Sequence, residues 1–156
     1  MATEQEKNKN LLKISSLVIH GLTKGLWDFI GEASFSTAQL IGDTAIKMLE
    51  KDMGLEINGE KPENILMELN RIFLDEIGAL TEADAEVEDK KIILTFKGCL
   101  FSEMTKDIMD SGIPPFICPF MGMSMAAMRK RGIKARVTDY NIDTDKKVCV
   151  HVFEML

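Results

Sequence analysis

The stretch AEVEDKKIILTFKGC, Ala85 to Cys99, decides the fold class of this chain. It is typical of a strand, a tight turn at Asp89–Lys90 and a second strand, because polar and apolar side chains alternate with a period of two. In the second arm three apolar side chains share one face of the expected strand: Ile92, Leu94 and Phe96. The sequence therefore predicts an antiparallel hairpin near the middle of the chain.

Upstream of Ala79 the apolar residues recur at helical spacing, so residues 10–78 are predicted to be helical. We expect the first helix to break between Gly21 and Gly31, since interior glycines weaken a helix. Ser34 or Ser36 is expected to cap a second helix. That helix should end at Gly54, and a third should end near Gly78.

Downstream of the hairpin, two short helices are expected in LFSEMTKDIMDSG and FMGMSMAAMRKR, followed by a closing hairpin that turns at DTDKK. The predicted strands cover about 85–98, 133–142 and 147–155. Helices followed by antiparallel strands define an α+β fold, here with two further helices inserted. We expect one domain over residues 1–156, with residues 1–9 as a disordered tail.

The composition narrows the classes of function. The chain has 156 residues and a net charge of −6, which argues against a broad basic surface for nucleic acid. Three cysteines indicate a reducing compartment, and neither a signal peptide nor an apolar run of membrane-spanning length is apparent. We therefore expect a cytoplasmic protein. The basic cluster from Arg129 to Arg136 fits either a helix C-terminus closed by Gly132 or a contact with an anion or partner.

Methionines are concentrated in the segment after Cys118. Met121, Met125 and Met128 recur at spacings of four and three, so they form one stripe on the expected helix. Met is flexible and polarizable, and it suits either an irregular core or a surface that adapts to apolar ligands. Both interpretations are open, because a pocket between helices and sheet would be lined by the same residues.

The cysteines offer a second candidate site. Cys149 and His151 lie two apart on a predicted strand and leave the same face, while Val148, Val150 and Val152 on the other face are expected to be core. With Cys99 and Cys118 they make a Cys₃His set, a composition that tetrahedral zinc accepts. Cys118 begins a helix, where the helix dipole is expected to lower the pKa of its thiol. The alternative is three buried cysteines that behave as small hydrophobic residues.

Motifs for enzymatic chemistry are scarce. The chain contains no glycine-rich phosphate loop after a strand, no serine-centred elbow and no His-Glu-x-x-His motif. Cys118 with His151 as its base is conceivable as a nucleophilic pair, but no third orienting group stands out. His20 fits a structural role in the first helix. Catalysis is therefore not the expected activity.

Several segments resemble the 4-vinyl reductase domain family, also described as predicted hydrocarbon-binding proteins. These segments are WDFIGEASFSTAQLIGDTAIKML, KGCLF, CPFMGMSMAAMRKRG and KKVCVHVFEML. The resemblance implies an α+β domain related to subunits of the TRAPP vesicle-tethering complex, a homodimer and an apolar cavity. It also implies cysteines, here Cys99, Cys118 and Cys149, at a suggested metal site. The chain lacks a nicotinamide or flavin motif, which argues against independent reductase activity.

The leading hypothesis is a cytoplasmic homodimer that binds a hydrophobic small molecule as a sensor or carrier. The predicted lining is Phe116, Phe120, Met121, Met125 and Met128, and the predicted metal ligands, with zinc as the metal, are Cys99, Cys118, Cys149 and His151. Two alternatives remain open: an enzyme or accessory factor that reduces a vinyl group on a tetrapyrrole-like substrate, and a module for protein assembly. Direct nucleic-acid binding and a membrane span are not expected.

Overall fold

The computed structural model describes residues 2–143 and 145–156. Its helices are α1 (Glu4–Ile30), α2 (Phe35–Met53), α3 (Pro62–Arg71), α4 (Ser102–Asp110) and α5 (Pro119–Lys130), with a 3-10 turn η1 (Gly31–Ser34) and a π-helical turn η2 (Ile72–Glu76). Its strands are β1 (Glu82–Glu88), β2 (Lys91–Lys97), β3 (Ala135–Asp143) and β4 (Val148–Met155). Helices precede the first strand, and α4 and α5 lie between the two hairpins, so the predicted α+β fold is confirmed.

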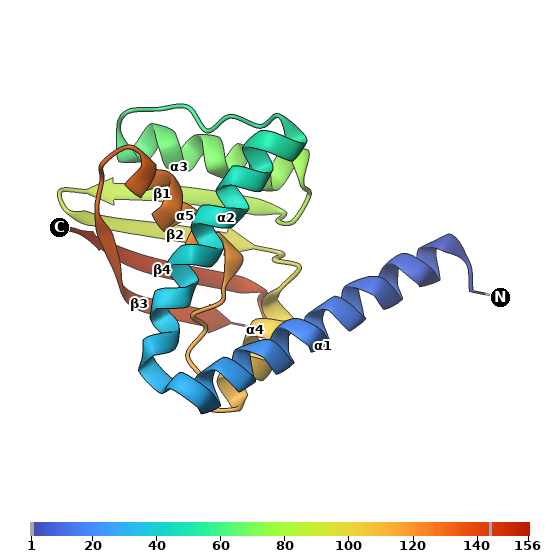
Figure 1. The fold of residues 1–156 in the computed structure, drawn as a ribbon. Coiled ribbons are helices and arrows are strands. Elements are labelled where there is room, and N and C mark those ends of the chain that lie inside the picture. The colour runs from blue at the N-terminus through green and yellow to red at the C-terminus, as the bar shows by residue number, and fades with distance from the viewer. Residues whose placement is uncertain (1, 144) are drawn as a thin grey trace.

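The four strands form one antiparallel sheet in the order β1-β2-β4-β3 (Figure 1). β1 and β2 pair from Glu82↔Lys97 to Glu88↔Lys91, and Asp89 takes a positive φ of 51° in the tight turn between them. The predicted turn at Asp89–Lys90 is therefore confirmed. The other predicted turn, DTDKK, includes Thr144, which lies outside the described residues.

Helices α2, α3 and α5 lie over one face of the sheet (Figure 1). The side chains of Ile92, Leu94 and Phe96 on β2 point to this face and are fully buried. On β4 the buried residues are Cys149, His151 and Phe153, while Val148, Val150 and Val152 are only half-buried. The prediction for β4 was therefore wrong, because β-branched residues suit a half-covered sheet face as well as a core.

Helices α2 and α5 cross at small residues. Gly42 of α2 lies against the backbone of Gly122 of α5, so that a Cβ added to Gly42 would lie 2.3 Å from the Gly122 carbonyl oxygen. Past the crossing, Arg129 and Lys130 in the last turn of α5 pair with Asp43 and Glu50 of α2. The structure thus uses these members of the basic cluster to hold two helices together.

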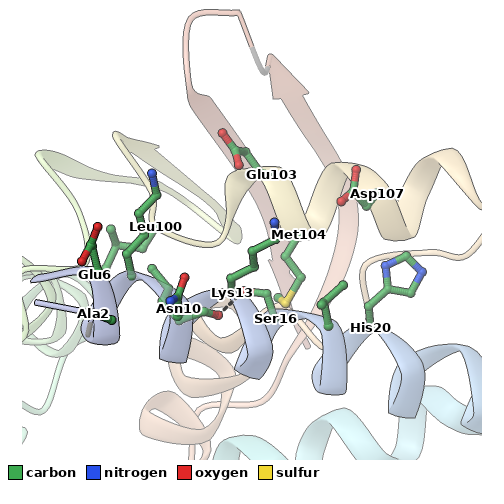
Figure 2. A pocket seen from close by; sticks show the side chains of 13 residues that line it. Ala2, Glu6, Asn10, Lys13, Ser16, His20, Leu100, Glu103, Met104 and Asp107 are labelled. Atoms are coloured by element: carbon green, nitrogen blue, oxygen red, sulfur yellow. Dashed lines mark hydrogen bonds between the residues drawn. The ribbon is translucent and has the colours of Figure 1, made fainter. Parts of the chain in front are cut away.

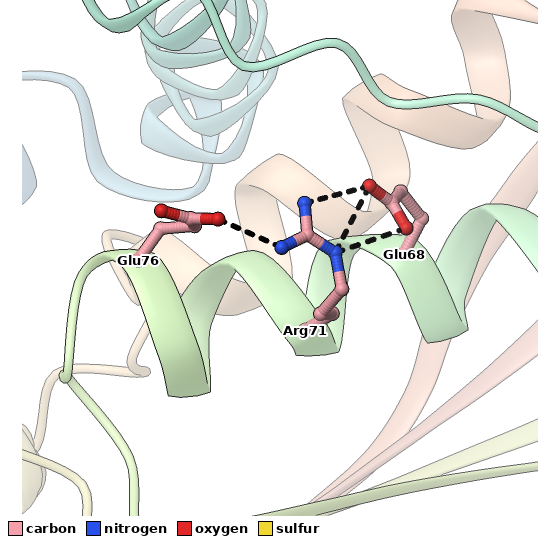
Figure 3. A network of polar contacts seen from close by, with 3 residues as sticks. All are labelled: Glu68, Arg71 and Glu76. Carbon is pink, nitrogen blue, oxygen red and sulfur yellow. Dashed lines mark hydrogen bonds and ion pairs between the residues drawn. The ribbon is translucent and has the colours of Figure 1, made fainter.

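The outer surface of α3 also carries ion pairs. The guanidinium of Arg71 lies between Glu68 and Glu76, with N···O distances of 2.9 Å and 2.8 Å (Figure 3). All three side chains are at least a quarter exposed, and exposed pairs of this kind contribute at most about 1 kcal/mol each. The network supports the end of α3, where the helix changes to the π-helical turn η2.

Helix α1 runs without a break through Gly21 and Gly25 and ends at Gly31, whose φ is 54°. Residues 4–9 of the expected disordered tail are helical in the structure, since α1 begins at Glu4. Thr3 and Glu6 form a reciprocal capping box that satisfies the first free N–H groups. The N-terminal half of α1 extends away from the rest of the protein (Figure 1). No helix within the described residues has the length and apolar character needed to cross a membrane.

Candidate functional site

An apolar pocket of about 270 Å³ lies where α1, α2 and α4 meet the segment before α5. α1 and α2 supply one side of it, and α4 with the residues around Cys118 supplies the other. Its lining residues are Ile19, Leu22, Ile41, Phe101, Met104, Ile117 and Pro119. All seven side chains are apolar, so the pocket favours an uncharged guest.

Aromatic side chains fix the wall beneath this pocket. Trp27 of α1 stacks on Phe116 with ring centroids 6.1 Å apart, and Phe35 of α2 packs edge-on against Phe116 at 6.0 Å. Phe101 lines the pocket and contacts Phe120, with 5.8 Å between ring centroids. Such aromatic pairs add about 0.5–1.5 kcal/mol each to the area that they bury. These pairs therefore stabilise the positions of Phe101 and Phe116 next to the pocket.

The observed lining differs from the predicted one. Met121 and Met128 are buried in the main core, and Met125 is half-buried against the same core. Phe116 and Phe120 are buried and do not line the pocket, and Phe120 packs against the lining residue Phe101. Most of the methionine stripe therefore belongs to the core, because α5 is covered by α2, α3 and the sheet. The methionine at the pocket is Met104.

Some of the missed lining residues had a signal in the sequence. Ile117 and Pro119 flank Cys118, directly before the methionine-rich segment. Ile19 and Leu22 belong to the apolar periodicity of α1. Their approach to Phe101 and Met104 depends on how α1 packs on α4, which no local pattern specifies.

Cys118 and His151, two of the four predicted metal ligands, meet in the interior. The Sγ of Cys118 lies 3.9 Å from Nε2 of His151, while Nδ1 of His151 has no hydrogen-bond partner. Burial raises the pKa of the Cys118 thiol to about 12, although the N–H groups of Met121 and Phe120 act to lower it. Burial also lowers the pKa of His151 to about 4. The expectation that the helix dipole lowers the Cys118 pKa was therefore wrong, since desolvation outweighs it.

Cys99 and Cys149 form a second pair. The interaction between the two thiols lowers the pKa of Cys99 and raises that of Cys149. The Sγ of Cys99 also accepts the backbone N–H of Phe101 at 3.3 Å. Cys99 is therefore the thiol in this pair whose anion the fold favours.

The four predicted metal ligands thus lie as two pairs on the core side of the sheet. Cys149 and His151 leave the same face of β4 and link the pairs. Over residues 2–143 and 145–156, no three His, Cys, Asp or Glu side chains are grouped closely enough to hold a metal ion together. Metal binding would require the side chains of the two pairs to close on each other.

A wider groove of about 970 Å³ separates the N-terminal half of α1 from α4. Figure 2 shows charged side chains of both signs around it, among them Glu6, Lys13 and Asp107, together with His20. The groove is open and mixed in polarity, and it lacks the convergent polar groups of a built binding site. It is a less specific candidate than the apolar pocket.

The chain matches the family described as "Putative rubredoxin C-terminal domain" over residues 15–154, and it therefore belongs to that family. It is also similar to the uncharacterized protein MJ0758 of Methanocaldococcus jannaschii. The two are 23% identical over 134 residues, which cover 85% of this chain and 81% of MJ0758.

Three solved structures share the fold. The trafficking protein particle complex subunit 3 from Naegleria fowleri, covalently bound to palmitic acid, has a TM-score of 0.56 at 10% identity, over 95% of this chain and 96% of that chain. The phenol-responsive sensory domain of the transcription activator PoxR, with phenol, has a TM-score of 0.56 at 11% identity, over 90% and 74%. An H-NOX protein from S. oneidensis in the Fe(II)NO state has a TM-score of 0.54 at 9% identity, over 88% and 74%. At these identities the likeness establishes the fold alone.

Proposed function

We propose that this protein binds an uncharged hydrophobic small molecule in the pocket between α1, α2 and α4, as a non-enzymatic sensor or carrier domain. The observation that carries the proposal is the pocket lining, which consists entirely of apolar side chains. A guest in this pocket would lose contact with water without leaving a polar protein group unpaired. The main driving force would therefore be the hydrophobic effect.

The size of the pocket limits the guest. Its volume of about 270 Å³ lies just below the usual range for ligand pockets, about 300–1,000 Å³. A molecule with one to three aromatic rings, or a short alkyl chain, fits this space. Burying roughly 250 Å² of its apolar surface contributes about 6 kcal/mol before ordering costs. We therefore expect binding no tighter than the micromolar range.

The comparisons lend support to a small-molecule role. Among the proteins of similar fold, one is a sensory domain that responds to phenol, and another carries palmitic acid. The sequence motifs that resemble the 4-vinyl reductase domain family favour the same class of guest. On the same grounds we propose that residues 1–156 act as one domain, that the protein is a homodimer and that it works in the cytoplasm.

Fluorescence titration with N-phenyl-1-naphthylamine, an uncharged apolar fluorophore, tests the proposal. Wild-type protein should bind it saturably, and phenol should be tried as a competitor. Ile117→Trp places a larger side chain in the pocket and should weaken binding at least tenfold. Met67→Trp is the matched control, because Met67 is exposed on α3, and it should bind as wild type does. Absence of saturable binding, or equal binding by Ile117→Trp, would contradict the proposal.

We also propose that the cysteine and histidine pairs bind zinc. Two observations support this: Sγ of Cys118 lies 3.9 Å from Nε2 of His151, and Cys99 and Cys149 influence each other's pKa. Three thiolates and one imidazole match a structural zinc composition. Bound zinc would join the end of β2, the start of α5 and strand β4.

A further inference from the structure

The outer face of α1 carries an apolar stripe that the rest of the described chain leaves uncovered. Five side chains spaced three, four or seven residues apart share this face, and each is between 55% and 87% exposed. They are Leu11, Ile14, Val18, Leu22 and Phe29, and we call them the α1 stripe. The side of α1 that faces the protein is marked instead by Thr23, which is fully buried, and by Ile19 and Leu26.

The α1 stripe is comparable in area with the largest apolar patch on a typical monomer. Each of its side chains offers on the order of 100 Å² of apolar surface, or roughly 500 Å² in all. Stable interfaces bury about 800 Å² per partner, and the largest patch on a typical monomer is about 300–600 Å². Phe35 and Leu40 on the neighbouring helix α2 are also exposed and extend the apolar area. With on the order of 100 Å² from each of these two side chains, the apolar area rises to roughly 700 Å², close to the area that one partner buries in a stable interface.

The backbone of the stripe permits close approach. Gly21 and Gly25 lie four residues apart beside it, and a Cβ added at either would meet nothing within 4 Å. A second helix can therefore lie against this part of α1. From Leu11 to Phe29 the stripe is about 27 Å long, so two copies of α1 can align over several turns.

The stripe is continuous with the pocket. Leu22 belongs to both, since it lines the pocket and is 62% exposed. Ile41 on the opposite side of the pocket is 39% exposed. Leu22 therefore joins the stripe to the rim of the pocket. A partner that covers the stripe at Leu22 therefore also approaches the mouth of the pocket.

We propose that the α1 stripe packs against the α1 stripe of a second copy of this chain, and that the second copy closes the mouth of the pocket. This inference rests on the proposed function and adds that dimerisation regulates ligand binding. A symmetric dimer presents the same patch from both subunits, so an apolar stripe is complementary to itself. The charged residues of α1 include both signs, as in the Lys24–Asp28 pair, and do not oppose this pairing.

A membrane surface is the less suitable occupant. Helices that lie on anionic membranes carry an excess of Lys and Arg on the polar face. The charges along α1 are mixed, and the whole chain carries a net charge of −6. A second copy requires no such excess.

Closure of the pocket by a second copy makes ligand binding and dimerisation thermodynamically linked. If the guest is held more tightly in the dimer, then the guest must strengthen the dimer by the same factor. A sensor domain of this design would report its ligand as a change in the monomer–dimer equilibrium.

Sedimentation velocity and probe titration on the same samples test this inference. Val18→Asp changes the stripe without touching a pocket-lining residue, and Met67→Asp is the matched control on α3. We expect wild type and Met67→Asp to be dimers at micromolar concentration, with a dimer dissociation constant that falls when N-phenyl-1-naphthylamine saturates the protein. Val18→Asp should be a monomer and should bind the probe at least tenfold more weakly.

Two results would overturn the inference: a Val18→Asp protein that remains dimeric, or a monomeric one that binds the probe as wild type does. Circular dichroism checks that the variant is folded, and Phe29→Ser, at the most exposed stripe position, replaces Val18→Asp if it is not. If wild-type protein fails to bind the probe, the proposed function and the linkage both fail, while sedimentation still decides the role of the stripe. If a monomeric variant binds normally, the proposed function stands and the linkage fails.

Discussion

Gly42 and Gly122 are in backbone contact at the crossing of α2 and α5, and the contact is asymmetric. A Cβ added to Gly42 would lie 2.3 Å from the carbonyl oxygen of Gly122, whereas a Cβ added to Gly122 would come no closer than 3.4 Å to the backbone of α2. Real Cβ atoms do not approach to 2.3 Å. Replacing Gly42 with Ala must therefore move the two helices apart, whereas replacing Gly122 with Ala need not.

We therefore expect Gly42→Ala to destabilise the protein by about 1–3 kcal/mol, the usual cost of overpacking. Gly122→Ala should change the free energy of unfolding by less than about 1 kcal/mol, since Ala favours helix by up to that amount and the new contacts are ordinary. Urea unfolding of both variants measures the difference. Equal stability of the two variants would contradict the observed crossing.

The buried imidazole of His151 should make stability depend on pH in protein freed of metal by a chelator. Its pKa in the fold is about 4, against 6.5 for an exposed histidine. Below pH 6.5 the unfolded chain binds a proton that the folded chain does not, so the free energy of unfolding falls as the pH is lowered. The fall should continue to about pH 4 and reach roughly 3 kcal/mol.

Unfolding free energies measured at several pH values between 4 and 7 test this prediction. In His151→Leu the free energy of unfolding should depend less steeply on pH, because the contribution of His151 is absent. An identical slope in the variant would show that other groups cause the dependence.

The zinc proposal predicts that protein purified without chelator contains one zinc ion per chain. Zinc binding requires deprotonated thiols, and burial raises the pKa of Cys118, so the affinity should fall steeply as the pH is lowered. Elemental analysis gives the stoichiometry, and cobalt substitution gives thiolate-to-metal absorption bands. Cys118→Ser should lose both signals. Substoichiometric zinc in wild-type protein, together with no cobalt bands, would refute the site.

The sequence predicted the fold well where a local pattern and tertiary packing agree. The alternation in Ile92–Phe96 and the turn at Asp89 specify β2 and its hairpin, and the structure reproduces both. The glycine stop at Gly54 likewise ends α2 in the left-handed conformation that was expected. These features depend only on residues close together in the chain.

Features that depend on how elements pack were harder to predict. The alternating residues of β4 identify two faces but not which face the helices cover, so Val150 and His151 were assigned to the wrong sides. The methionine stripe lies on a helix, as predicted. Other elements enclose that helix, α5, so its methionines pack in the core, and the methionine that lines the pocket is Met104 of α4. Of the four predicted metal ligands, Cys118 and His151 approach each other across the core, but the full set of four is not grouped within the described residues.

The last prediction concerns thiol reactivity. Cys99, Cys118 and Cys149 are all buried free thiols, so each should react with a bulky disulfide reagent such as Ellman's reagent only when the fold opens. Cys118 lies between Ile117 and Pro119, which line the pocket, so N-phenyl-1-naphthylamine should slow its modification further. Mass spectrometry of partly modified protein, with and without the probe, gives the rate at each cysteine. Cys149 lies on β4, away from the pocket lining, and serves as the internal control for a general increase in stability. Fast modification of Cys118 in the folded protein, or equal protection of Cys118 and Cys149 by the probe, would contradict the proposed placement of the ligand.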